Sequence, residues 1–273
     1  MRYLEISIPV LDELKEIIMA ELDNLGFEGI WDQGSEIQAY IPEERFKHKE
    51  TYDTLMRYGM ENSFSKNVLE EKNWNEEWEK NYDPVAIDTR VLVRSPFHKQ
   101  DDSFDYQVVI DPKMSFGTGH HATTKLVMRL MLTLDFNNKK VLDMGMGTGV
   151  LSFFASMLGA SAVIGIDNDP KCVENALENA KYNHVNNVKF LSGSSDAIPP
   201  TEFEVVLSNI TKNINMQLLP HLAKVVSTKG YLILAGFLNF DLEEVDALVV
   251  KLNFTPIRTI SIDDWEGIIY QKN

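Results

Sequence analysis

The sequence has a single cysteine and no long apolar run, and these two absences bound its class. Cys172 has no partner in the chain, so an internal disulfide is excluded and a reducing compartment is indicated. No run approaches the roughly 18 apolar residues of a membrane span, and residues 1–9 are typical of a strand, not of a signal peptide. We therefore expect a cytoplasmic protein without a membrane segment.

Positive charge is also scarce. Lys and Arg number 26 against 41 Asp and Glu, which gives a net charge of −15 over 273 residues. Residues 1–80 hold nine basic and nineteen acidic side chains, so two thirds of the excess lies there. Such a surface repels phosphate backbones and attracts a basic partner, although a solvated face that keeps the protein in solution explains it equally well. We expect no direct nucleic-acid recognition.

The chain is long enough for a small and a large domain, and its patterns divide it in that way. Residues 1–72 follow the order β-α-β-β-α-β, which is typical of a ferredoxin-like α+β domain with its helices on one face of the sheet. The second of these helices is predicted at 43–58. Residues 73–84 predict a helical linker that Pro84 ends. Residues 85–273 form the larger α/β domain.

Short apolar runs alternate with helices in the large domain. After two strands at 91–94 and 106–110, the runs lie at 141–143, 163–167, 188–191, 205–207, 231–235, 257–262 and 267–271. Continuous apolar strands separated by helices predict a seven-stranded, Rossmann-like parallel sheet that is covered on both faces. Ligands of such sheets bind at the carboxyl ends of the strands.

A glycine-rich turn follows the first of the seven runs. Asp143 stands before Gly145, Gly147 and Gly149, and Asp167 ends the next run. Glycine adopts unusual backbone angles and lets the backbone approach a ligand closely. The turn therefore predicts a nucleotide-type cofactor site, with a tight strand-to-helix turn that binds nothing as the alternative.

The spacing of the turn indicates which cofactor it takes. Dinucleotide sites read G-x-G-x-x-G and bind a pyrophosphate, whereas this turn reads D-x-G-x-G-x-G. A carboxylate at Asp143 repels a pyrophosphate and attracts a cation. S-Adenosylmethionine carries an ammonium and a sulfonium but no phosphate, and Asp167 stands where an acid accepts hydrogen bonds from ribose hydroxyls. We therefore predict S-adenosylmethionine as the cofactor.

A second motif precedes the first helix of the large domain. Gly117 and Gly119, with hydroxyl groups beside them, make a flexible loop of the kind that wraps a ligand. Thr123 or Thr124 is expected to cap the helix that follows. The two adjacent histidines of the loop have no acid or cysteine at ligand spacing, so we expect no metal site.

Four segments together resemble the ribosomal protein L11 methyltransferases, a family of class I S-adenosylmethionine-dependent methyltransferases, over essentially the whole chain. They are Phe116-Gly117-Thr118-Gly119-His120-His121-Ala122-Thr123-Thr124, the turn 143–149, Gly165-Ile166-Asp167 and Ser208-Asn209-Ile210. The resemblance implies that the acidic N-terminal domain recognises the ribosomal protein. It implies methylation of lysine amino groups, with the N-terminal amine as a further candidate. The cofactor contacts that it implies, together with those expected from the turn and the loop, are Thr124, Gly145, Asp167, Asn209, Asp143, Gly147 and Gly119.

The acceptor amine must lose its proton before it is methylated, because its ordinary pKa is about 10.4. A desolvated pocket lowers that pKa. Asn209 is the predicted catalytic residue, since its carbonyl oxygen orients the amine without adding a charge. Thr118 and His120 are expected either to close over the donor and relay the proton or to serve only the structure of the loop.

Two residues depart from the family pattern. Met146 stands between the glycines, and Lys212 follows Asn209-Ile210-Thr211 at the expected rim of the acceptor pocket. A base methyltransferase acting on nucleic acid typically needs an Asn-Pro-Pro-aromatic or Asp-Pro-Pro-aromatic tetrad at 209–212, which this chain lacks. A small-molecule methyltransferase and a non-catalytic module are the remaining alternatives.

Overall fold

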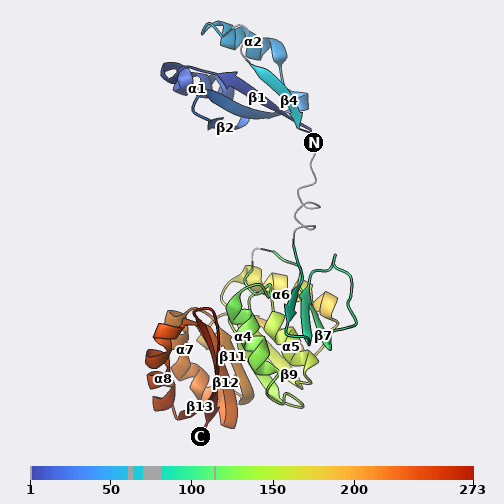
Figure 1. The fold of residues 1–273 in the computed structure, drawn as a ribbon, viewed down its shortest axis with the longest axis vertical. Helices are drawn as coiled ribbons and strands as arrows, with labels where there is room; N and C mark the ends of the chain where they lie inside the picture. The colour runs from blue at the N-terminus through green and yellow to red at the C-terminus, as the bar shows by residue number, and fades with distance from the viewer. Residues whose placement is uncertain (1, 61–63, 70–81, 114) are drawn as a thin grey trace. The chain divides into compact units, whose positions relative to one another are not determined.

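The computed structural model describes residues 2–60, 64–69, 82–113 and 115–273 of the chain. The chain divides into two compact units, Met1–Asn81 and Tyr82–Asn273, both drawn in Figure 1. Of the predicted linker helix, residues 73–81 lie outside the described residues, and residues 82–84 are not helical.

The N-terminal unit is a four-stranded sheet with two helices. Its elements are β1 (Tyr3–Pro9), α1 (Lys15–Asn24), β2 (Glu28–Asp32), β3 (Glu36–Pro42), α2 (His48–Met56) and β4 (Ser65–Leu69). The strand order is β2-β3-β1-β4 and every neighbouring pair is antiparallel, which is the predicted ferredoxin-like arrangement. Alternate residues of β1 and β3 form its core with Ile18 and Leu22 of α1 and Leu55 of α2.

The second helix begins five residues later than the sequence predicts. Residues Glu43–Arg45 form a separate 3-10 turn, and Phe46 after it is extended, with φ −70° and ψ 117°. Phe46 turns into the core beside the ring of Phe27, 6.3 Å away between centroids. Because that packing needs an extended backbone, α2 starts only at His48.

A seven-stranded sheet organises the large unit. Its strands are β8 (Lys140–Met144), β9 (Ala162–Asp167), β10 (Val188–Ser192), β11 (Phe203–Asn209), β12 (Val226–Leu238), β13 (Phe254–Ile262) and β14 (Trp265–Lys272), in the order β10-β9-β8-β11-β12-β14-β13. All seven predicted strands are therefore confirmed. The prediction of parallel pairing is wrong for β14, which is antiparallel to both neighbours because Asp263, at φ 53°, turns the chain straight back after β13.

Helices cover both faces of this sheet, as predicted, and Figure 1 shows them on opposite sides. Val141 of β8 packs into the core under α4 (Ala122–Met131) and α5 (Val150–Met157). The next residue, Leu142, packs into the core under α7 (Lys212–Val225) and α8 (Leu242–Lys251). Successive side chains of a strand point to opposite faces, so a strand buried on both faces is apolar throughout.

A small sheet that the sequence shows only in part adds to the first of these cores. It consists of β5 (Val85–Ile87), β6 (Val91–Arg94) and β7 (Tyr106–Val109), in that order. The strands β6 and β7 are predicted, but β5 is too short for its apolar pattern to stand out. Its Val85 and Ile87 pack with Val93 and Val108 in the core that also holds α4 and α5. No helix in the described part of the chain is long and apolar enough to cross a membrane.

Candidate active site

The glycine turn joins β8 to α5 and is fixed to the end of β9. Gly145, Gly147 and Gly149 have φ values of 75°, 54° and 82°, a region that glycine adopts without strain. The N–H groups of Gly145 and Met146 donate to the carbonyl of Ile166, at 2.8 and 3.1 Å. The turn thus has one defined shape at the carboxyl ends of two neighbouring strands.

Loops that cross the turn also require its glycines. A Cβ on Gly145 would collide with the side chain of Ile210, and a Cβ on Gly147 would collide with the carbonyl oxygen of Phe116. From the sequence, these glycines are predicted to let a ligand approach the backbone closely. The structure adds close approach of the chain itself, at the loops that follow β7 and β11.

Asp167 is the last residue of β9, and its carboxylate is held in one orientation. Oδ2 accepts a hydrogen bond from the N–H of Gly147 at 2.9 Å, and Oδ1 accepts one from the N–H of Asp169 at 3.0 Å. The residue is 9% exposed and lines the main pocket. Each oxygen of a carboxylate accepts two hydrogen bonds, so both oxygens keep an acceptor site for a ligand.

Asp143 is held quite differently, although it is the next-to-last residue of the neighbouring strand. It is fully buried under the turn, and Ser152 of α5 donates to its Oδ2 at 2.6 Å. Burial raises the pKa of this carboxyl to about 7, with a further contribution from the charge of Asp167. Asp143 does not line the pocket.

The loop at residues 116–124 begins against the glycine turn and ends in α4. The first residue before α4 is His121, whose Nδ1 accepts a hydrogen bond from the N–H of Thr123 at 3.3 Å. The prediction that Thr123 or Thr124 caps the helix is therefore wrong, because both already have helical backbone and are buried in its first turn. Imidazole takes the capping role that a hydroxyl usually has.

His120 points away from the pocket. Its Nε2 lies 3.1 Å from the carbonyl oxygen of Asp83, which can only accept, so Nε2 carries the proton. Nδ1 then accepts from the hydroxyls of Thr118 and Tyr82, at 3.2 and 3.3 Å. Neither Thr118 nor His120 lines the pocket, so their contacts favour loop structure over proton relay.

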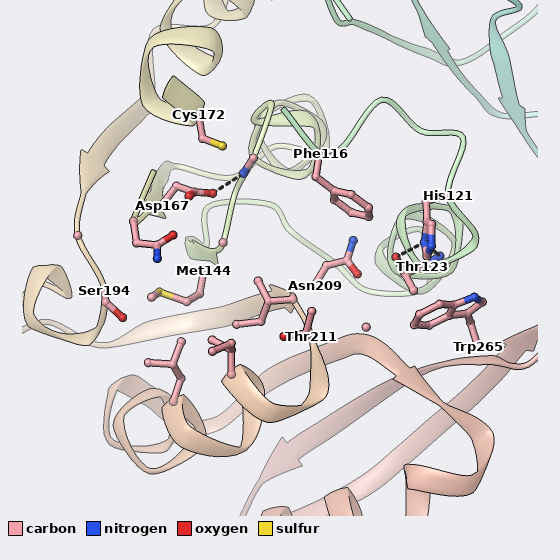
Figure 2. Close-up of a pocket in the computed structure, with 18 residues that line it drawn as sticks. Phe116, His121, Thr123, Met144, Asp167, Cys172, Ser194, Asn209, Thr211 and Trp265 are labelled. Atoms are coloured by element: carbon pink, nitrogen blue, oxygen red, sulfur yellow. Dashed lines mark hydrogen bonds between the residues drawn. The ribbon is translucent and has the colours of Figure 1, made fainter. Parts of the chain in front are cut away.

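A pocket of about 580 Å³ runs along the carboxyl ends of the strands. Figure 2 shows its two ends, with the side chain of Asn209 between them. The polar end is lined by Asp167, Cys172 and Ser194. The aromatic end is lined by the rings of Phe116, His121 and Trp265, where His121 lies 5.3 Å from Phe116 and 4.9 Å from Trp265 between centroids.

The pocket brings together four of the seven residues expected to bind the cofactor, namely Gly145, Gly147, Asp167 and Asn209. Asp143, Thr124 and Gly119 do not line it. Thr124 is fully buried, and its hydroxyl has no hydrogen-bond partner among the described residues. Gly119 lies against β6, where a Cβ would come within 3.0 Å of Val93.

Trp265, Cys172 and Ser194 line the pocket without having been predicted. Cys172 and Ser194 each follow a strand closely, at the end of the sheet where ligands bind, which is a signal that the sequence does offer. Trp265 starts β14, and only the antiparallel direction of that strand brings it to this edge. Among the described residues, no group of three or more His, Cys, Asp or Glu side chains is placed to hold a metal ion.

Asn209 ends β11 and is 8% exposed, and its Oδ1 is a buried acceptor with no partner among the described residues. The chain beyond it is fixed by Asn215, whose Nδ2 donates to the carbonyls of Ile210 and Ala235, both at 2.9 Å. Ser208 in turn donates to Oδ1 of Asn215 at 2.6 Å. The amide oxygen of Asn209 is thus a preorganised acceptor beside the pocket.

The two departures from the family pattern have defined places. Met146 is buried, and its sulfur would lie 2.5 Å from a Cβ on Gly165, so glycine at that position gives it room. Lys212 pairs with Asp241 and Glu244, at 2.8 Å each, and these contacts raise the pKa of its ammonium. It does not line the pocket, so the expectation that it alters the rim of an acceptor site is wrong.

These residues fit a cationic nucleoside cofactor. Asp167 keeps acceptor sites for hydroxyls, the glycine turn exposes backbone at Gly145 and Gly147, and Asn209 offers an unpaired carbonyl oxygen. The strand order, with one antiparallel strand inserted next to the edge, together with this site defines a class I S-adenosylmethionine-dependent methyltransferase.

Comparisons with known proteins narrow the class. The family model described as Ribosomal protein L11 methyltransferase (PrmA) matches residues 3–273, so the chain belongs to the ribosomal protein L11 methyltransferase family. It is 32% identical to the ribosomal protein L11 methyltransferase of Phocaeicola vulgatus over 276 residues, which cover 98% of each chain. The Bacillus subtilis relative of the same name is 28% identical over 94% of this chain and 87% of that protein.

Solved structures agree on the fold. The ribosomal protein L11 methylase from Lactobacillus delbrueckii subsp. bulgaricus has a TM-score of 0.65 to this chain at 22% identity, covering 70% of this chain and all of that one. A putative RNA methyltransferase from Pyrococcus horikoshii has a TM-score of 0.50 at 20% identity over 59% of this chain. At these identities the likeness concerns the fold alone.

Proposed function

We propose that this protein transfers a methyl group from S-adenosylmethionine to lysine amino groups of ribosomal protein L11, and to its N-terminal amine. The observation that carries the proposal is the amide oxygen of Asn209, a buried and unpaired acceptor between the two ends of the pocket. When bound, the cofactor supplies an electrophilic methyl group. The protein must then hold the acceptor nitrogen in line with it.

The polar end is the proposed cofactor side. There Asp167 accepts hydrogen bonds from the ribose hydroxyls, and Gly145 and Gly147 present backbone to the ligand. Asp143 lies beneath the turn and contributes by stabilising the shape of the turn. Neither Thr124 nor Gly119 lines the pocket. Both contribute by shaping the loop at 116–124.

The aromatic end is the proposed acceptor side. Burial among the rings of Phe116, His121 and Trp265 disfavours the charged ammonium and so lowers the pKa of the amine that they surround. The neutral amine keeps a lone pair for the methyl group while one of its N–H bonds donates to Oδ1 of Asn209. The ammonium would first release one proton to water; the N–C bond would then form as the S–C bond of the donor breaks, leaving a neutral thioether, and the methylated nitrogen would release a second proton to water.

The N-terminal unit is the proposed partner-recognition unit. Its excess of acidic residues suits a basic ribosomal protein and opposes direct readout of nucleic acid. We assign the protein to the cytoplasm, where such a substrate is made and where a lone cysteine stays reduced.

The direct test is to incubate the full chain with methyl-labelled S-adenosylmethionine and purified L11, with a second basic ribosomal protein as the control. We expect label on L11 lysines and none on the control. Label that appears only in small molecules added from a cell extract would replace the proposal with a small-molecule methyltransferase.

The role of Asn209 is tested by two substitutions. Asn209→Ala removes the acceptor and should lower kcat about a hundredfold, because the amine is no longer aligned. Asn209→Asp adds a negative charge that raises the pKa of the amine, so its activity should recover as pH rises. An unchanged pH profile for Asn209→Asp would show that the amine does not approach this side chain.

The division of labour between the units is tested with a chain of residues 82–273. We expect it to bind S-adenosylmethionine with the affinity of the full chain, measured by calorimetry, and to lose methylation of L11. Full methylation of L11 by this shortened chain would remove the N-terminal unit from partner recognition.

A further inference from the structure

The loop at 116–124 and the glycine turn are connected through one buried residue, Thr148. Its N–H donates to the carbonyl oxygen of Phe116 at 2.9 Å, and its hydroxyl donates to the carbonyl oxygen of Gly117 at 2.6 Å. Thr148 is fully buried and Gly117 is buried with it. These two hydrogen bonds therefore form away from water, where losing either leaves a costly unpaired carbonyl.

Asn179 of α6 (Pro170–Asn183) supports this junction from behind. Its Nδ2 donates to the carbonyl oxygen of Thr148 at 3.1 Å, and its Oδ1 accepts from the N–H of Asp111 at 2.9 Å. Asp111 begins the segment that leads to Phe116. The segment is thus tied to the glycine turn at both ends, by Asn179 at its start and by Thr148 at its finish.

The loop and the turn fit each other without spare room. A Cβ on Gly117, which has φ 107°, would lie 2.7 Å from the hydroxyl oxygen of Thr148. Gly147 on the other side leaves space for the carbonyl of Phe116. The loop and the turn are therefore in close contact at both glycines.

Phe116 is the residue through which this junction reaches the pocket. Its ring is 53% exposed and contacts His121 at the aromatic end, as Figure 2 shows. Phe116 belongs to none of the apolar cores of the described residues, so its position depends on its own backbone and on the contact with His121. That backbone is held by Thr148.

We propose that Thr148 and Asn179 are positioning residues, which hold Phe116 at the acceptor end by fixing its backbone to the glycine turn. The assignment rests on the proposed function for the meaning of the acceptor end. Neither side chain touches the pocket. Both should therefore affect use of the acceptor more than binding of the cofactor.

The first test compares Thr148→Val with Thr148→Ser in the full chain. Valine keeps the shape of threonine but lacks the hydroxyl, so the carbonyl of Gly117 loses its partner. We expect kcat/KM for L11 to fall about tenfold while the dissociation constant of S-adenosylmethionine changes less than about threefold. Serine keeps the hydroxyl and should restore kcat/KM.

The second test uses two asparagines of the same helix as a matched pair. Asn179→Ala cuts the tie to Thr148. Asn183→Ala cuts buried hydrogen bonds to Val109 and to the backbone carbonyl of Asn179, which are outside the turn and the loop. Both substitutions should lower the unfolding temperature. Only Asn179→Ala should also lower kcat/KM for L11, and equal losses in the two variants would reduce Asn179 to a structural role.

Hydrogen exchange of the peptide that spans residues 115–124 gives a readout that needs no substrate. We expect faster exchange in Thr148→Val and Asn179→Ala, and wild-type exchange in Thr148→Ser and Asn183→Ala. Unchanged exchange in Thr148→Val would overturn the proposal even if L11 is the substrate. Faster exchange in a protein whose wild-type form does not methylate L11 would support the junction and reject the proposed function.

Discussion

The strands β8 and β9 each carry an aspartate in their last two residues, and the two carboxyl groups are held in opposite ways. Asp143 is sealed beneath the glycine turn with one hydrogen bond from Ser152 and a pKa of about 7. Asp167 faces the pocket with both oxygens oriented by backbone N–H groups. One carboxyl is part of the scaffold, and the other lines the pocket, where we propose that it binds the cofactor.

The difference comes from a short offset along the sheet. Asp143 pairs in register with Gly165 of β9, and Asp167 lies two residues beyond that pair. Two residues of a strand span about 7 Å, which is enough to carry the second carboxyl past the edge of the sheet. The exact position of an acid near a strand end must therefore be known before a role is assigned to it.

Asp167 and Asp143 should differ most in how strongly each affects the binding of S-adenosylmethionine. Asp167→Ala removes the oriented carboxylate and should raise the dissociation constant of S-adenosylmethionine about a hundredfold, since hydrogen bonds to a charged group contribute about 1.5–3 kcal/mol each. Calorimetry measures it. Asp169→Ala is the control, because this side chain only caps α6. Equal losses of affinity in Asp167→Ala and Asp169→Ala would show that the Asp167 carboxylate has no special role in binding the cofactor.

A smaller effect is expected on how the free energy of unfolding changes with pH, and it comes from Asp143. The pKa of Asp143 is about 7 in the folded protein and about 3.9 in an unfolded chain, so the folded form holds the extra proton between those values. Its contribution to stability is therefore complete below about pH 4, declines as pH rises and is lost above about pH 7. Asp143→Asn cannot ionise and should lack this decline.

The measurement is the free energy of unfolding at pH 5 and pH 8. Between these values the wild type should lose about 2 kcal/mol more than Asp143→Asn. Affinity for S-adenosylmethionine should change less than about threefold. A large loss of affinity would mean that Asp143 acts on the cofactor directly, and the contrast with Asp167 would fail.

The smallest expected effect comes from Ser152→Ala. It removes the hydrogen bond that lowers the pKa of Asp143, so the pKa rises further and the decline in stability moves to higher pH. The cost at neutral pH should be about 1 kcal/mol. Ser156→Ala is the matched control on the same helix, because Ser156 bonds to Asn187 instead. The same pH profile in both variants would contradict this.

Much of the fold could be predicted because burial leaves a direct trace in the sequence. The seven apolar runs are the strands of a sheet that is covered on both faces, and the glycine turn lies where its spacing places it. An apolar run does not show whether its strand is parallel or antiparallel to its neighbours, however, so the antiparallel pairing of β14 could not be predicted from the sequence. The position of Trp265 depends on that pairing and was missed with it.

The site was predicted less completely, for a similar reason. Asp167 and Asn209 end their strands and line the pocket, as residues at strand ends tend to. Thr124 and His121 belong to one motif, yet only His121 lines the pocket, because the turn of α4 decides which side chain points inward. Spacing along the chain gives proximity to a site, and three-dimensional packing gives orientation.

The antiparallel insertion of β14 makes one of the last segments of the chain part of the pocket wall. Chains emerge from the N-terminus, so the residues of the polar end are made roughly 70 to 100 residues before Trp265. β14 fills the gap between β12 and β13, and it carries the ring that completes the aromatic end. The aromatic end is therefore the last part of the pocket to be completed as the chain is made.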